Sequence, residues 1–144
     1  VGSEMCIRDS LKALPLEKKK ELLKNMAKDN IRFLGHVPND SLPEIYERHD
    51  VFILPSRYEP WGLVVEEALF RGLPVIASDK VGSAADMVAA LETGAVFSLS
   101  APDGLRNAIH EVEKNYETMA RRVADINWNS RVETQLKAYT SLLD

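Results

Sequence analysis

Two glutamates in this 144-residue chain flank a stretch that is suited to hold an anion. Seven residues separate Glu59 from Glu67, and Gly62 lies between them at the start of a run without helix breakers. The first amides of such a helix, those of Gly62, Leu63 and Val64, would lack an intrahelical acceptor and lie at the positive end of the helix dipole. Phosphate is the usual ligand of such amides, and carboxylates accept hydrogen bonds from sugar or ribose hydroxyls. Either glutamate alone would be interpreted as a solvated charge, but the combination predicts a site for a phosphorylated sugar compound.

The residues around these glutamates predict a strand, a loop, a helix and a second strand. VFILP at 51–55 and VIAS at 75–78 are short apolar runs, typical of strands buried on both faces of a parallel sheet. Gly72 stands where a left-handed residue would end the helix, and Pro74 follows it. We expect the helix to be buried along most of its length, because its apolar residues fill one broad arc of the helical wheel. It would begin beyond the carboxyl end of the first strand, where open α/β sheets hold their ligands.

Helices and strands alternate along the rest of the chain, which predicts a parallel α/β sheet with flanking helices. Two capping boxes, Ser41 to Glu44 and Ser130 to Glu133, are each predicted to open a helix, the first ending near His49. The other predicted elements are a helix over Leu16–Asp29, a strand over Ile31–Gly35, a helix over Ala84–Ala90, a strand over Ala95–Leu99 and helices over Asp103–Asn115 and Tyr116–Asp125.

Composition and charge exclude several classes of function. The formal net charge is −4, so nucleic acid is not expected as a partner, and no apolar run is long enough to span a membrane. The first ten residues, VGSEMCIRDS, resemble a sequencing adaptor translated in frame, and we interpret 1–10 as a non-native segment. The single cysteine, Cys6, lies within it, so the remaining residues carry no disulfide framework.

The segment EPWGLVVEEA, which contains both glutamates, resembles the E-x7-E signature of glycosyltransferase family 4, a group of retaining enzymes with the GT-B fold. The flanking segments SR, GLPVIASD and VGSAAD are also similar to that family. The resemblance implies a Rossmann-like sheet of order 3-2-1-4-5-6 and makes residues 11–144 a partial carboxyl-terminal, donor-binding domain. Strand 31–35 would be strand 3, followed by strands 4, 5 and 6, and strands 1 and 2 would be missing. We therefore expect the chain alone to be unstable or to pair strand 31–35 directly with 51–55.

The resemblance also implies a reaction and a role for each site residue. Family members transfer a sugar from a nucleotide diphosphate to an acceptor hydroxyl with retention at the anomeric carbon. Glu59 would be the catalytic residue that holds the donor sugar, and Glu67 would bind the ribose. The amides of Gly62, Leu63 and Val64 would bind the diphosphate, and the loop of Gly35, His36 and Val37 would contact the base, mostly through its backbone.

Partners and cofactors follow from the same resemblance. There is no D-x-D motif to clamp a divalent metal, so neither a metal nor another cofactor is expected. The acceptor, a glycan or a lipid-linked sugar, would bind through a missing amino-terminal domain, and without that domain the fragment would be inactive. Such an enzyme would serve polysaccharide or glycolipid synthesis in the cytoplasm, and a lipid-linked acceptor would bring it to the inner membrane face as a peripheral protein. A sugar-nucleotide epimerase of the same fold and a non-catalytic nucleotide-binding module are the alternatives.

Overall fold

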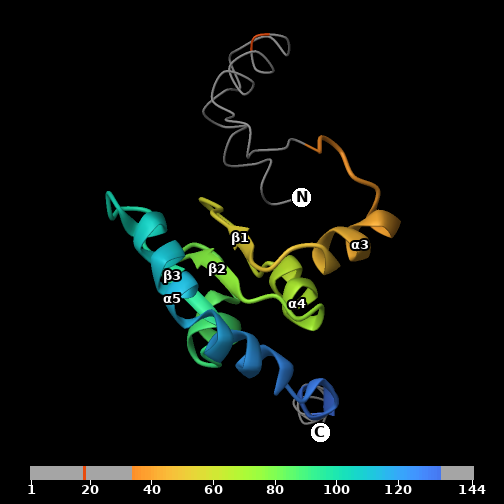
Figure 1. Ribbon diagram of the computed structural model, residues 1–144. Coiled ribbons are helices and arrows are strands. Elements are labelled where there is room, and N and C mark those ends of the chain that lie inside the picture. Colours follow the sequence, from red (N-terminus) through yellow and green to blue (C-terminus); the bar gives the residue numbers. More distant parts are fainter. Residues whose placement is uncertain (1–17, 19–33, 134–144) are drawn as a thin grey trace, which may run out of the picture.

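A computed structural model describes residue 18 and residues 34–133 of the chain (Figure 1). The segment 1–10 and most of the predicted helix Leu16–Asp29 lie outside the described residues. So do the first three residues of the predicted strand Ile31–Gly35, and its last two, Leu34 and Gly35, are not in a strand.

Among the described residues, three parallel strands form the sheet. They are β1 (Phe52–Leu54), β2 (Val75–Ser78) and β3 (Gly94–Phe97), and they lie in the order β1-β2-β3. Ile53 pairs with Ile76, which in turn pairs with Ala95. The predicted parallel α/β sheet is confirmed for these three strands. Within residues 34–133, β1 has no strand on its other side, so the predicted pairing with strand 31–35 stays untested.

The described helices are η1 (Asn39–Ser41), α3 (Leu42–Glu47), α4 (Leu63–Phe70), the π-helix η2 (Ala84–Ala89) and α5 (Gly104–Ala124). A further helical segment runs from 128 to 133. The helix predicted in two parts over Asp103–Asn115 and Tyr116–Asp125 is a single helix, α5, because nothing near position 115 breaks it. In the described region, no helix combines the length and apolar character needed to cross a membrane.

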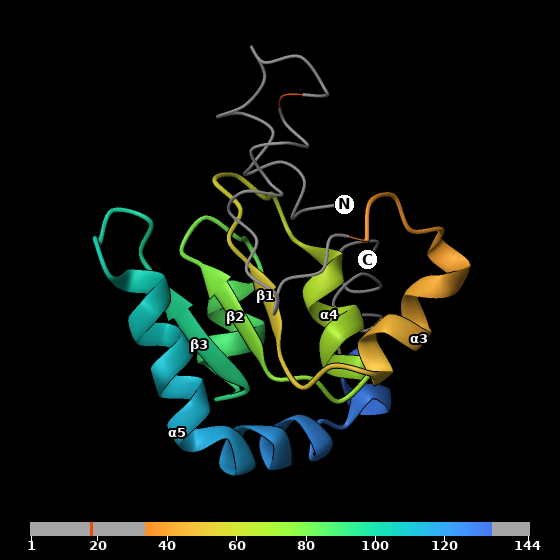
Figure 2. The same cartoon turned by 45° about the horizontal axis from the view of Figure 1, so that its top comes forward.

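The sheet is covered on both faces. Val75 and Ala77 of β2 face a core that also contains Val65 of α4 and Met87 of η2. Ile76, which points the opposite way because side chains alternate along a strand, packs in a second core with residues of α5. In Figure 2, α5 runs past β3 and along the lower end of the sheet, so that the chain then reaches the side of α4. The burial of β2 on both faces explains its continuous apolar sequence.

Both predicted capping boxes are wrong in detail. Ser41 makes no side-chain cap, because η1 leads directly into α3. At the last helix the cap is Asn127, whose Oδ1 accepts a hydrogen bond from the Ser130 amide at 3.0 Å, so the helix begins before Ser130. The helix after β2 is present, but it is a π-helix rather than a regular α-helix.

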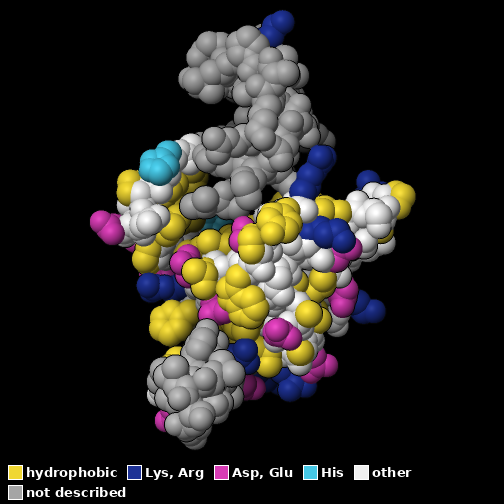
Figure 3. Space-filling model, turned by 180° about the vertical axis from the view of Figure 1, so that it is seen from behind, with side chains coloured by type: hydrophobic (Ala, Val, Ile, Leu, Met, Phe, Trp, Pro, Cys, Tyr) yellow, Lys and Arg dark blue, Asp and Glu magenta, His cyan; other side chains and the backbone are white. Residues whose placement is uncertain are grey.

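Helix α4 has the predicted buried arc but is not buried along most of its length. Val65, Ala68 and Leu69 are buried, whereas Leu63, Glu67 and Phe70 are exposed. Its end is as predicted, since Gly72 has a φ of +88° just beyond the helix. Seen from behind, hydrophobic and acidic side chains lie next to one another on the surface of the molecule (Figure 3).

Candidate functional site

The start of α4 has the geometry of an anion site. Gly62 is the residue before the first turn, and its carbonyl accepts the first helical bond, from the Val65 amide at 2.9 Å. The preceding amides are those of Gly62, Leu63 and Val64. They donate no backbone hydrogen bond to any of the residues that the structure describes. In Figure 2 this helix start lies at the upper end of the view, where the three strands end. The helix dipole therefore points its positive end into the carboxyl edge of the sheet.

Gly62 is required at this turn for two reasons. Its φ of +88° lies in the left-handed region, which side chains with a Cβ rarely adopt. A Cβ placed there would lie 2.9 Å from Cγ1 of Val81 and 3.2 Å from Cγ of Glu59. The second distance also shows that the Glu59 side chain lies directly beside the helix start.

The loop that carries Glu59 is held by the loop that follows β2. The Glu59 amide donates to the Lys80 carbonyl at 3.0 Å, and the Glu59 carbonyl accepts from the Gly82 amide at 2.9 Å. One residue further, the Ser83 amide donates to the Trp61 carbonyl at 2.8 Å. Gly82 permits this approach, because a Cβ there would lie 2.0 Å from the carbonyl oxygen of Pro60. This contact between the loops was not predicted from the sequence, in which Gly82 was the available signal.

Glu67 lies one turn into α4, on the side that faces α3. Its Oε2 accepts a hydrogen bond from the Tyr46 hydroxyl at 3.4 Å. Burial, followed by the nearby charge of Glu67 and this bond, raises the pKa of Tyr46 to about 12. Tyr46 thus remains a neutral hydrogen-bond donor over the physiological range. Tyr46 was not predicted from the sequence, since only the fold brings it to Glu67, which lies 21 residues away.

Glu66, the neighbour of Glu67, has a different aromatic partner. Trp61 Nε1 donates to Glu66 Oε1 at 2.8 Å. The indole is 41% exposed, so it does not pack beneath the loop. The two adjacent carboxylates are therefore held apart, Glu66 toward the loop before the helix and Glu67 toward α3.

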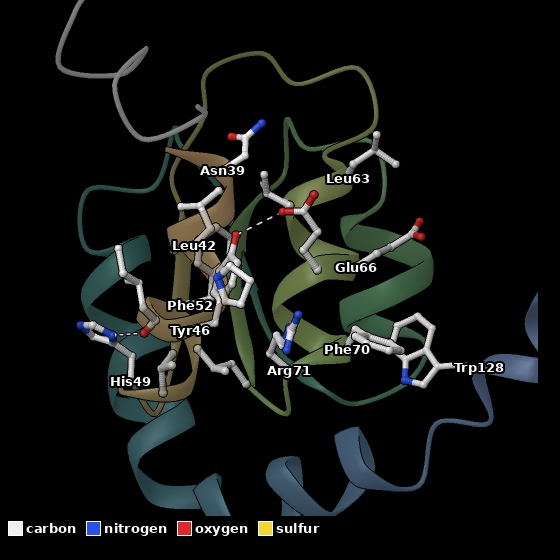
Figure 4. A pocket seen from close by; sticks show the side chains of 16 residues that line it. Asn39, Leu42, Tyr46, His49, Phe52, Leu63, Glu66, Phe70, Arg71 and Trp128 are labelled. Carbon is white, nitrogen blue, oxygen red and sulfur yellow. Dashed lines mark hydrogen bonds between the residues drawn. The ribbon is translucent and has the colours of Figure 1, made fainter. Parts of the chain in front are cut away.

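A groove with a volume of about 880 Å³ separates α3 from α4 (Figure 4). Tyr46 and Leu42 line it from α3, and Glu67 lines it from α4. At its far end the rings of Phe70 and Trp128 meet edge to face, with their centroids 5.7 Å apart. The groove is mostly apolar, with its carboxylates on the α4 side.

The loop predicted to contact a base lies apart from these contacts. Gly35 and His36 are exposed, Val37 is half-buried, and Gly35 has a φ of +70°. Among the described residues, none of the three has a side-chain bond to the start of α4. The segment leading to α3 does lie at the same upper end of the molecule as the helix start in Figure 2.

Two further polar features lie at the carboxyl edge of the sheet. Asp79, after β2, accepts a hydrogen bond from the Ser98 hydroxyl at 2.8 Å, which together with the Leu99 amide and Lys80 lowers the pKa of Asp79. The hydroxyls of Ser56 and Ser83 are buried and have no partner among the described residues. No cluster of three or more potential metal ligands occurs in the described part of the chain.

Comparison with known proteins decides the family. The family described as "Glycosyl transferases group 1" matches residues 12–127. The chain belongs to this glycosyltransferase family. The matched range includes both glutamates, the loop of residues 35–37 and all three strands.

Similar proteins include several sugar-transferring enzymes. Over 64 residues the chain is 39% identical to mannosylfructose-phosphate synthase of Agrobacterium fabrum, covering 44% of this chain and 14% of that enzyme. Sucrose-phosphate synthase of Thermosynechococcus elongatus has a similar structure, with a TM-score of 0.63 and 24% identity, over 99% of this chain and 42% of that one. Starch synthase IV of Arabidopsis thaliana, solved with ADP and acarbose, has a TM-score of 0.63 and 21% identity, over 88% of this chain and 30% of that one.

These structural neighbours have the GT-B fold, and the three parallel strands with flanking helices described here form part of it. The glycosyltransferase chain spans less than half the length of each of these relatives.

Proposed function

We propose that this chain is the donor-binding part of a retaining glycosyltransferase that uses a nucleotide-diphosphate sugar. The observation that supports the proposal is the start of α4, where amides that have no acceptor among the described residues lie in the chain between Glu59 and Glu67, with the Glu59 side chain beside them. Membership of the glycosyltransferase family gives this arrangement a substrate class.

In this proposal each group acts on a different part of the donor. The amides of Gly62, Leu63 and Val64 bind the diphosphate and stabilise the negative charge that grows on it as the glycosidic bond breaks. Glu59, whose Cγ lies close to Gly62, accepts hydrogen bonds from the sugar hydroxyls. Glu67 accepts from the ribose, and the backbone of residues 35–37 contacts the base. The transition state resembles an oxocarbenium ion, so the carboxylate of Glu59 also stabilises positive charge at the sugar.

The acceptor would bind outside the described residues. Relatives named as synthases of mannosylfructose phosphate and sucrose phosphate, and a starch synthase solved with ADP and acarbose, support a nucleotide-sugar donor and a sugar acceptor. We propose that the acceptor is a glycan or a lipid-linked sugar held by a second domain, that the whole enzyme acts in the cytoplasm or at the inner membrane face, and that the transfer needs no metal.

Binding measurements on the chain test the proposal. UDP, ADP and GDP, each with and without an attached glucose or mannose, are titrated by calorimetry or by ligand-observed NMR. We expect one nucleotide to bind and its sugar form to bind more tightly. Glu59→Gln should weaken binding of the sugar form about tenfold and change binding of the free nucleotide by no more than a few-fold, because Glu59 would contact only the sugar.

Glu117→Gln, an exposed site on α5, is the matched control and should change neither affinity. Equal binding of nucleotide and nucleotide sugar, unaffected by Glu59→Gln, would favour a nucleotide-binding module instead. Failure of all these ligands to bind would contradict the proposal for this chain.

A further inference from the structure

Two polar contacts join helices α3 and α4: Tyr46 donates to Glu67, and at the carboxyl end of both helices Arg71 donates to Glu47. Tyr46 is only 9% exposed, and its ring packs in the core with Phe52, edge to face at a centroid distance of 5.7 Å. Packing of this kind restricts the ring to one orientation. The ring orientation in turn fixes the direction of the hydroxyl, which points to Glu67 (Figure 4).

Two charged neighbours of Glu67 have partners elsewhere. Glu66 accepts from Trp61, and the guanidinium of Arg71, just past the end of α4, donates to Glu47 at 3.1 Å. Within residues 34–133, the Tyr46 hydroxyl is therefore the side-chain group that donates a hydrogen bond to Glu67, and it does so at Oε2. The second oxygen, Oε1, is left to accept a hydrogen bond from a ligand.

A neutral donor can hold the Glu67 side chain in one orientation and leave its charge available to a ligand, which a cation cannot do. A glutamate side chain rotates about three bonds, and ordering it costs conformational entropy that a partner must offset. A lysine or arginine would order it but would also neutralise its charge and compete for its oxygens. A phenol hydroxyl donates one hydrogen bond and leaves the carboxylate ionised. At 3.4 Å the bond is long, and such contacts tighten when a ligand completes the site.

We propose that Tyr46 is a positioning residue, which orients Glu67 so that its free oxygen accepts the hydrogen bond of a ribose hydroxyl. This inference rests on the proposed function, in which Glu67 binds the ribose. Tyr46 itself touches no part of the donor.

The test separates ribose recognition from folding by changing the ligand as well as the protein. Dissociation constants of UDP, ADP and GDP are compared with those of their 2′,3′-dideoxy forms, for the unchanged chain, Tyr46→Phe, Glu67→Gln and the control Tyr116→Phe on α5. In the unchanged chain we expect the ribonucleotide to bind more tightly. Tyr46→Phe should weaken ribonucleotide binding about 3- to 10-fold, the range of one hydrogen bond, and leave dideoxynucleotide binding unchanged. Tyr116→Phe should change neither.

Each outcome decides a different question. If Tyr46→Phe weakens both ligands equally, its role is structural and the inference is wrong. If Glu67→Gln removes the preference for ribose and Tyr46→Phe does not, the inference fails while the proposed role of Glu67 stands. If Glu67→Gln leaves the preference unchanged, the ribose role in the proposed function is wrong and the inference fails with it.

A second measurement covers the case in which Tyr46→Phe does not fold. The unchanged sequence is labelled with 3-fluorotyrosine and followed by fluorine NMR, with the Tyr46 resonance assigned from the four tyrosines by the remaining Tyr→Phe variants. The inference requires this resonance to shift with the ribonucleotide and not with the dideoxynucleotide. The same shift with both ligands, or with neither, overturns it.

Discussion

Gly62 shows how one residue sets the geometry of the site. Its left-handed backbone turns the chain from the Glu59 loop into α4, and its missing side chain leaves room for Val81 and Glu59. A residue with a Cβ cannot meet both requirements without moving one of these neighbours.

Gly62→Ala is therefore expected to weaken both folding and binding. The left-handed φ and the 2.9 Å contact with Val81 Cγ1 should together lower the free energy of unfolding by about 2 kcal/mol. Nucleotide binding should fall more steeply than stability, since the first amides of α4 would be displaced. Urea unfolding and calorimetric titration measure the two effects. Gly72→Ala, with the same φ but nothing within 4 Å of the added methyl, is the control and should affect stability alone.

Tyr46 predicts how stability depends on pH in the alkaline range. The pKa of its phenol is about 12 in the folded chain against 10.0 for a free tyrosine. Because the folded pKa is the higher one, stability is unaffected below about pH 10 and is lost as pH rises from about 10 through 12, by up to about 3 kcal/mol.

Unfolding by urea between pH 8 and pH 11.5 checks this prediction, together with ultraviolet titration of the four tyrosines. The Tyr46 phenol should ionise at a higher pH than a free tyrosine. Tyr46→Phe should lose both the late titration and the corresponding part of the alkaline destabilisation. A Tyr46 that ionises with the other tyrosines would contradict the packing described here.

At the scale of elements, the site depends on two loops that stabilise each other. The loop before α4 and the loop after β2 share three backbone hydrogen bonds, and Gly82 allows them to touch. The position of Glu59 is thus determined by a loop that begins 20 residues later in the chain.

Gly82→Ala tests this dependence. The added methyl would lie 2.0 Å from the Pro60 carbonyl oxygen, so the two loops must separate. We expect loss of about 2 kcal/mol of stability and at least a tenfold weaker affinity for the nucleotide sugar, with a smaller effect on the free nucleotide. The informative quantity is the loss of affinity for the nucleotide sugar beyond the loss for the free nucleotide. A general loss of folded protein would weaken the binding of both ligands equally.

The sequence predicted the elements best where local pattern and burial agree. Local residue types predict the apolar strands β1 and β2, and the two glycines at 62 and 72 predict where α4 begins and ends. Capping boxes misled because Ser41 and Ser130 each have a competing neighbour, η1 in one case and Asn127 in the other. Tyr46 and Gly82 could not be assigned to the site, since their partners are set by the packing of distant segments.

At the scale of the whole molecule, β1 forms one edge of the sheet that residues 34–133 build. Ile53 is 37% exposed, and β1 has no strand beside it other than β2 in the described region. Unpaired edges of this kind bind other strands. The expectation that the chain alone is unstable, or that strand 31–35 pairs here, concerns this same edge and remains a prediction.

Self-association at this edge can be measured directly. We expect light scattering after size-exclusion chromatography to show dimers or larger species as the chain is concentrated. Ile53→Lys, which places a charge on the edge, should reduce them. Val132→Lys, at an exposed hydrophobic residue outside the sheet, is the control. A monomer at all concentrations would indicate that the edge of β1 is covered in solution.

The segment that follows α5 packs beside α4, and this determines when α4 is covered during translation. Phe70, 63% exposed even in the complete fold, gains its aromatic neighbour Trp128 only after α5 has been made. A nascent chain that has emerged as far as β3 already contains the anion site, but the outer side of α4 is still uncovered. Partly made chains with exposed apolar helices are prone to aggregate. The segment around Trp128 can therefore cover this side of α4 only after β3 and α5 have been made.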